Sequence, residues 1–265
     1  MKILQKSTLF LSLLLMAGMN TSCIILKAPE KIEASGITST RDTSLAGFSQ
    51  LKISSLFQVE LVPSGKDSLH LEFDQALEPY LDIRCEGNRL DLGLKESVRT
   101  DDGLQVKARL FYKELESLRV SGASSARFLD TLRTERLSVR ISGASSVHVL
   151  ADAGNLDVKG SGASQFSGYC QARNARMEFS GASLANPQGH IGKGHVRLSG
   201  ASHFKAYPLA FDTLSIEASG ASHGKCTARE MLDAQVSGAS SLHYQGEART
   251  SIKTSGASSV LKQES

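Results

Sequence analysis

The chain has 265 residues and a mass of 28.3 kDa, with 40% hydrophobic and 22% charged residues. This composition is typical of a soluble folded protein and excludes a disordered chain, a multi-span membrane protein and a collagen. The formal net charge is +3. It becomes +1 (28 basic minus 27 acidic residues) without Lys2 and Lys6 of the leader, which argues against a nucleic-acid partner.

Residues 1–22 are predicted to be a signal peptide. Lys2 and Lys6 precede an apolar stretch from Leu9 to Met19, whose eleven residues are too few to span a hydrocarbon core of roughly 30 Å. The segment is therefore expected to be cleaved.

The cysteine that follows this leader points to lipid attachment. The stretch from Asn20 to Cys23 resembles a bacterial lipobox, in which the cysteine is lipidated, although an aliphatic residue usually stands at the place of Asn20. Ordinary signal-peptidase cleavage is the alternative, and both routes predict export. Residues 24–27 lack the acidic run that resembles a surface-export tag of Bacteroidetes lipoproteins. We therefore expect an outer-membrane lipoprotein on the periplasmic face rather than on the cell surface, with residues 23–40 as a tether.

Residues 41–115 are predicted to be a less regular β-rich half. Apolar residues alternate with polar ones in short runs such as Leu51/Ile53, and turn sequences such as Pro63-Ser64-Gly65 and Asp101-Asp102-Gly103 separate the runs. Residues 75–80 are expected to form one helical turn. We expect this half to cap the N-terminal end of a repeat stack.

The tetrapeptide Ser-Gly-Ala-Ser occurs eight times in residues 116–265, at intervals of about 19 residues. The first serine and the glycine of each copy are assigned to a structural corner. These residues are Ser121, Gly122, Ser142, Gly143, Ser161, Gly162, Ser180, Gly181, Ser199, Gly200, Ser219, Gly220, Ser237, Gly238, Ser255 and Gly256.

A fixed pattern of apolar and polar residues surrounds each copy. The residue three positions before the first serine is always apolar and the residue one position before it is mostly apolar, while the residue between them is polar. This period of two predicts a strand with one buried and one wet face. We call the polar position the ladder; its members are Arg119, Arg140, Lys159, Glu178, Arg197, Glu217, Gln235 and Lys253.

The repeat predicts an all-β fold, a single-stranded right-handed parallel β-helix (β-solenoid). A period of about 19 residues is too short for strand–helix units or helical repeats, and eight coils would stack to roughly 38 Å. In the corner we expect glycine at positive φ, alanine in a tight interior and serine hydroxyls bonded to the equivalent serine one coil away. Only seven residues follow the last motif. We therefore expect its strand edge to pair with another copy or another protein.

Three cysteines remain after Cys23: Cys85, Cys170 and Cys226. Cys170 and Cys226 fall three repeats apart, about 14 Å at strand spacing, which is too far for a disulfide. All three are expected to be small buried residues.

The SGAS coils behind a β-rich half, with Gly36 and Phe48 as entry landmarks, resemble the putative auto-transporter adhesin head GIN-domain family. The resemblance covers roughly residues 36–265. It implies a β-helical fold, export and an adhesive or envelope role, and it transfers no catalytic residues.

Few residues point to catalysis. No GxSxG elbow is present and no Asp or His keeps register with the motif serines. His203 and His223 follow the motif in consecutive coils, where we expect a stacked polar pair rather than a metal site. No metal and no cofactor are predicted.

The sequence therefore predicts a non-catalytic, exported cell-envelope protein that acts as an adhesin or other binding module, or as a structural module, with a glycan or an envelope protein as its expected partner. The ladder begins with a small basic patch, explained either by solubility and protection against aggregation or by contact with an acidic glycan or lipid headgroup. The alternative function is a carbohydrate-active enzyme on the same scaffold.

Overall fold

The computed structural model describes residues 30–95, 98–100 and 104–264. The predicted signal peptide, Cys23 and the turn at residues 101–103 lie outside the described residues. The strands are β1 (Glu30–Ile32), β2 (Thr38–Ser44), β3 (Gln50–Ile53), β4 (Phe57–Pro63), β5 (Ser68–Asp74), β6 (Leu81–Glu86), β7 (Arg89–Leu94), β8 (Val98–Thr100), β9 (Val106–Tyr112), β10 (Ser117–Val120), β11 (Ser125–Phe128), β12 (Leu132–Ile141), β13 (Ser146–Gly160), β14 (Gln165–Phe179), β15 (Leu184–Leu198), β16 (His203–Ala218), β17 (His223–Val236), β18 (Ser241–Gln245), β19 (Arg249–Thr254) and β20 (Ser259–Lys262). The 3-10 helix η1 covers Gln75–Tyr80, where a helical turn was expected. In this part of the chain no helix is long and apolar enough to cross a membrane.

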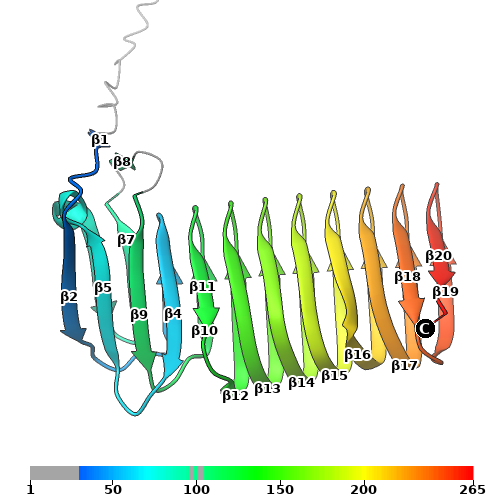
Figure 1. Ribbon diagram of the computed structural model, residues 1–265. Helices are drawn as coiled ribbons and strands as arrows, with labels where there is room; N and C mark the ends of the chain where they lie inside the picture. The colour runs from blue at the N-terminus through cyan, green and yellow to red at the C-terminus, as the bar shows by residue number, and fades with distance from the viewer. Residues whose placement is uncertain (1–29, 96–97, 101–103, 265) are drawn as a thin grey trace, which may run out of the picture.

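The repeats form a parallel stack in which each coil lies beside the equivalent part of the next (Figure 1). Val139 pairs with Val158, Val158 with Met177 and Met177 with Val196, so the sequence repeat is also the spatial repeat. The predicted β-solenoid of 19-residue coils is thereby confirmed. Its right-handed sense stays a prediction.

Each coil has two sides, one before and one after the corner. In β14 buried and exposed residues alternate until Arg173 and Asn174, which are both exposed, and the alternation then resumes in the opposite phase. The chain turns back there, so both sides of the coil direct apolar side chains into one interior. Phe166, Phe179 and Phe204 meet in this core, with ring centroids 6.1 and 6.2 Å apart.

The SGAS tetrapeptides form tight corners along one side of the stack. All eight glycines have φ between 69° and 79°, as expected. The backbone hydrogen bonds that join neighbouring strands continue through the corners. The Ala144 N–H donates to the Gly122 carbonyl at 2.9 Å, and the same bond recurs in later coils. Hence the corners stack in register with the strands.

The interior position of the corner belongs to the second serine, not to alanine. Our expectation for alanine was wrong, because the motif alanine is exposed in every copy whereas Ser145, Ser183 and their equivalents in all but the last copy are buried. The buried hydroxyl closes its own turn, as in the bond from Ser183 Oγ to the Ser180 carbonyl at 2.6 Å. A buried polar group needs such a partner. The expected bond between equivalent serines is present for Ser164 and Ser183, at 3.1 Å.

The N-terminal half continues the stack before it changes character. Strands β3 and β4 pair in parallel with β10 and β11, and on their other side with β7 and β9. Only beyond these two coils do antiparallel strands begin, where β5 pairs with β9, β2 with β5 and β6 with β7. Parallel stacking therefore extends well into the segment predicted to be irregular.

One coil of the regular stack is distorted. The register of β16 shifts against both neighbours around Tyr207 and Pro208, between Ala206 and Ala210 on the β17 side. Proline has no N–H to donate to a neighbouring strand, so it fits this bulge.

The three cysteines of the described residues are free thiols. Cys170 and Cys226 are buried, which raises the pKa of each thiol to about 12. Cys85 is only half-buried, and its thiol lies 3.7 Å from the Ala46 carbonyl oxygen.

In the last coil, β19 and β20 pair on one side only with described strands. Pairing of this edge with another copy stays a prediction.

Candidate functional site

The ladder residues lie in register across the stack, as predicted from the motif spacing. Arg119 pairs with Arg140, Arg140 with Lys159 and Lys159 with Glu178, and the column continues to Lys253. It also extends in the other direction to Lys52, which sequence reasoning missed. The signal was present, since Leu51-Lys52-Ile53 has the same apolar–polar–apolar order as the repeats.

The middle of the ladder, from Lys159 to Glu217, neutralises its own charge. Lys159 Nζ lies 3.0 Å from Glu178 Oε2, and the Arg197 guanidinium donates two hydrogen bonds of 3.0 Å to Glu217. The hydrogen bond from Lys159 lowers the pKa of Glu178, and that from Arg197 lowers the pKa of Glu217. These coils therefore present paired charges.

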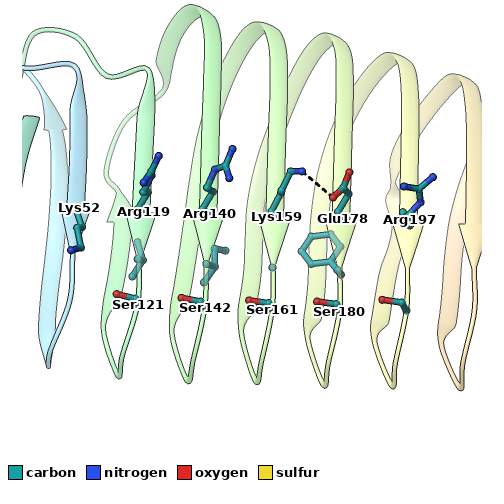
Figure 2. Close-up of a pocket in the computed structure, with 15 residues that line it drawn as sticks. Lys52, Arg119, Ser121, Arg140, Ser142, Lys159, Ser161, Glu178, Ser180 and Arg197 are labelled. Atoms are coloured by element: carbon teal, nitrogen blue, oxygen red, sulfur yellow. Dashed lines mark ion pairs between the residues drawn. The ribbon is translucent and has the colours of Figure 1, made fainter. Parts of the chain in front are cut away.

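A groove runs along the stack between the ladder and the corners, with a volume of about 530 Å³. Figure 2 shows the long ladder side chains along one side and the first serines of the corners along the other. Its residues are Lys52, Arg119, Val120, Ser121, Arg140, Ile141, Ser142, Lys159, Gly160, Ser161, Glu178, Phe179, Ser180, Arg197 and Ser199. We call this set the ladder groove. Five of the predicted corner serines, Ser121, Ser142, Ser161, Ser180 and Ser199, thus line a surface as well as forming a turn.

The two histidines after the motif stack as predicted. The rings of His203 and His223 lie 5.1 Å apart at 21°, and His223 Nδ1 is 2.7 Å from Ser241 Oγ. Both are exposed. Within the described ranges, His, Cys, Asp and Glu side chains form no group of three or more that could hold a metal ion.

The second serines of the motif make structural hydrogen bonds in most coils, although Ser124 Oγ is buried without a partner in the described residues. Ser145 Oγ donates to the Ser142 carbonyl at 2.8 Å and approaches the Gly122 carbonyl of the preceding coil at 3.3 Å. The Ser–His contacts in the described part of the chain involve Ser167 and Ser241, which lie outside the motif. The arrangement of the motif serines is that of a turn, which differs from a nucleophile beside its base.

These features define a parallel β-solenoid whose surface consists of straight columns of exposed side chains. The chain belongs to the family described as "Putative auto-transporter adhesin, head GIN domain", whose model matches residues 47–248. The family predicted from the SGAS coils is thereby confirmed. A search of curated proteins finds no match.

Solved structures share the fold at low sequence identity. A protein described as a putative adhesin from Parabacteroides merdae has a TM-score of 0.83 and 17% identity, covering 89% of this chain and 100% of its own. One described as a putative lipid binding protein from Parabacteroides distasonis has a TM-score of 0.84 and 18% identity, with the same coverage. A putative adhesin from Bacteroides fragilis has a TM-score of 0.67 and 18% identity, covering 88% of this chain and 100% of its own. These similarities show the fold.

Proposed function

We propose that this protein is an exported, non-catalytic module of the cell envelope that binds through the flat sides of its solenoid. Membership of an adhesin-type family supports a binding role. The observation that carries the proposal is the register of the surface columns: equivalent side chains recur at every strand along one straight line. A rigid surface with regularly spaced polar groups suits an extended polymer or another strand edge.

The proposal includes a lipid anchor at Cys23 and placement at the outer membrane, with the periplasmic face preferred. Its support is the leader, which combines a basic start, a short apolar stretch and a cysteine. Residues 23–37 would then separate β2, the first strand of the large sheet, from the lipid.

Intact mass of the protein from its native host, together with surface proteolysis of whole cells, tests this placement. The expected result is a mass of the chain from Cys23 plus acyl groups, with the protein protected from external protease. Cleavage by that protease would instead show that the protein lies on the cell surface. A mass that includes the leader would overturn export itself, and a Cys23→Ser variant provides the matched control for lipid attachment.

A further inference from the structure

Three consecutive coils of the ladder groove carry cations without counter-ions. Lys52, Arg119 and Arg140 lie in register and are exposed, and among the described residues they form no ion pair. The next carboxylate along the column is already engaged: Asp91, in register with Lys52, lies 2.6 Å from the Arg89 guanidinium. The groove thus has a neutralised end and a positive end.

This run of like charges does not serve the fold. Neighbouring strands lie about 4.8 Å apart, and like charges directly opposite each other on a sheet destabilise it. The same position holds Glu178, Glu217 or Gln235 in other coils, so the solenoid does not require a cation there. An anion from outside the chain would offset the repulsion.

The shape of the groove favours a linear ligand over a membrane. The cations form one line, and the hydroxyl groups of Ser121, Ser142 and Ser161 run parallel to it (Figure 2). Membrane-surface binding usually combines basic residues with inserted apolar side chains. The large apolar side chains that the described surface exposes lie outside the groove; they are Ile37, Leu129, Tyr169, Met231, Ile252 and Leu261.

We propose that the ladder groove binds an acidic polysaccharide. Its carboxylate or sulfate groups pair with Lys52, Arg119 and Arg140, and its hydroxyl groups exchange hydrogen bonds with the serines of the opposite wall. This inference rests on the proposed binding function and names its ligand class. Arginine suits the role because its fork of donors matches a carboxylate or sulfate in two contacts.

Binding of defined polymers to the folded exported chain tests the site. The probes are polygalacturonate, dextran sulfate, neutral dextran and phosphatidylglycerol vesicles, each titrated by calorimetry at low and high salt. Both acidic polysaccharides are expected to bind and to weaken with salt, because screening shortens the reach of exposed charges. Neutral dextran serves as the control polymer.

The variant Arg119→Gln/Arg140→Gln is expected to bind the acidic polysaccharides about ten-fold more weakly, which corresponds to about 1.4 kcal/mol. Arg127→Gln/Lys205→Gln is the matched control, since it removes the same charge from the side of the coil that follows the corner. This control is expected to keep wild-type affinity. Arg119→Lys/Arg140→Lys is expected to bind more tightly than the Gln variant but more weakly than wild type, because lysine keeps the charge and loses the two-contact fork.

A stability measurement separates binding from a structural role. Removing Arg119 and Arg140 relieves repulsion, so the unfolding midpoint is expected to stay unchanged or to rise while binding falls. A lower midpoint with weaker binding would instead make the pair structural and overturn the site.

Three further outcomes overturn the inference: equal losses in both double variants, no binding of either acidic polymer, or tighter binding of the vesicles. None of them alters the result of the mass and proteolysis experiment. Failure of the ligand class and failure of the envelope role are therefore distinguishable.

Discussion

The corner between β3 and β4 and the SGAS corners occupy the same place in neighbouring coils but solve it with different residues. The segment Ser54-Ser55-Leu56-Phe57 stands where Ser121 to Ser124 stand in the next coil. Ser55 and Leu56 have φ of 60° and 68°, the conformation that glycine supplies in the motif. A buried Phe57 replaces the buried serine.

Stacking explains why only one of these corners needs glycine. A Cβ on Gly143 would lie 2.8 Å from the Gly122 carbonyl oxygen, because each corner rests on the one before it. The segment that joins β7 to β9, in the coil before Ser55, carries no SGAS motif in its sequence. The glycine of the motif is thus a response to close stacking of corners.

The largest effect is expected for Phe57→Ser, which introduces the serine of the motif into the corner between β3 and β4. Phe57 is fully buried, so the change leaves a cavity, and we expect a loss of about 3–5 kcal/mol in the free energy of unfolding. Chemical denaturation measures the loss. Phe57→Leu, which keeps most of the volume, should cost much less; equal losses would show that volume does not hold this corner.

Gly181→Ala examines the opposite corner. Gly181 has φ of 71°, and an added Cβ would lie 2.8 Å from the Gly162 carbonyl oxygen, so we expect a loss of about 2 kcal/mol or more. Gly65→Ala in the N-terminal region is the control, because its Cβ would meet nothing within 4 Å. Similar thermal midpoints for the two variants would contradict the stacking explanation.

Ser183→Ala removes the hydroxyl that closes a corner. The Ser180 carbonyl loses its 2.6 Å hydrogen bond and Ser164 Oγ loses its 3.1 Å contact, with an expected cost of about 1 kcal/mol. Ser180→Ala, which leaves both contacts in place, is expected to change the unfolding midpoint little. An unchanged midpoint in Ser183→Ala would refute the closing role of the buried hydroxyl.

The smallest expected effect is on the pH dependence of stability, and it comes from one carboxyl group of the N-terminal region. Hydrogen bonds from the Ser35 hydroxyl and the Ala76 N–H lower the pKa of Asp74 from 3.8 to about 2. A lowered folded-state pKa stabilises the protein above pH 3.8, and this contribution disappears as the pH falls through about 2.

Asp74→Asn should therefore flatten the dependence of the unfolding midpoint on pH between 4 and 2. Ser35→Ala, which removes the largest cause of the pKa shift, is expected to have a partial effect. A full slope in Asp74→Asn would assign the acid sensitivity to other carboxyl groups.

The regular half of the fold and its ladder were predictable because one motif marks every coil. The two coils before it were not, because stack order and chain order differ there: β7 and β9 follow β4 in the chain but precede β3 and β4 in the stack. Between them the chain forms β5, η1 and β6, so no constant interval reveals the coils. Alternation also cannot decide which residue of a corner points inward, and the alanine expectation failed for that reason.

The sequence predicted the charges of the ladder, but only the structure shows that they line a candidate binding site. The sequence places three cations first in the column and repeats the apolar–polar–apolar order at Lys52, but it does not show that Lys52 lies beside Arg119 or that a groove separates these cations from the serines. Both facts depend on packing between segments distant in the chain.

The bulge of β16 has a mechanical consequence. Hydrogen bonds between coils run along the axis of the stack, so a tensile load between the first and last coils passes through every coil interface in series. Among the full-length strands β13 to β17, the interfaces on both sides of β16 keep fewer residue pairs in register than the unbroken β14–β15 interface, because the register shifts around Pro208. Within that run of full-length strands, a pull along the axis is therefore expected to separate the coils first at β16.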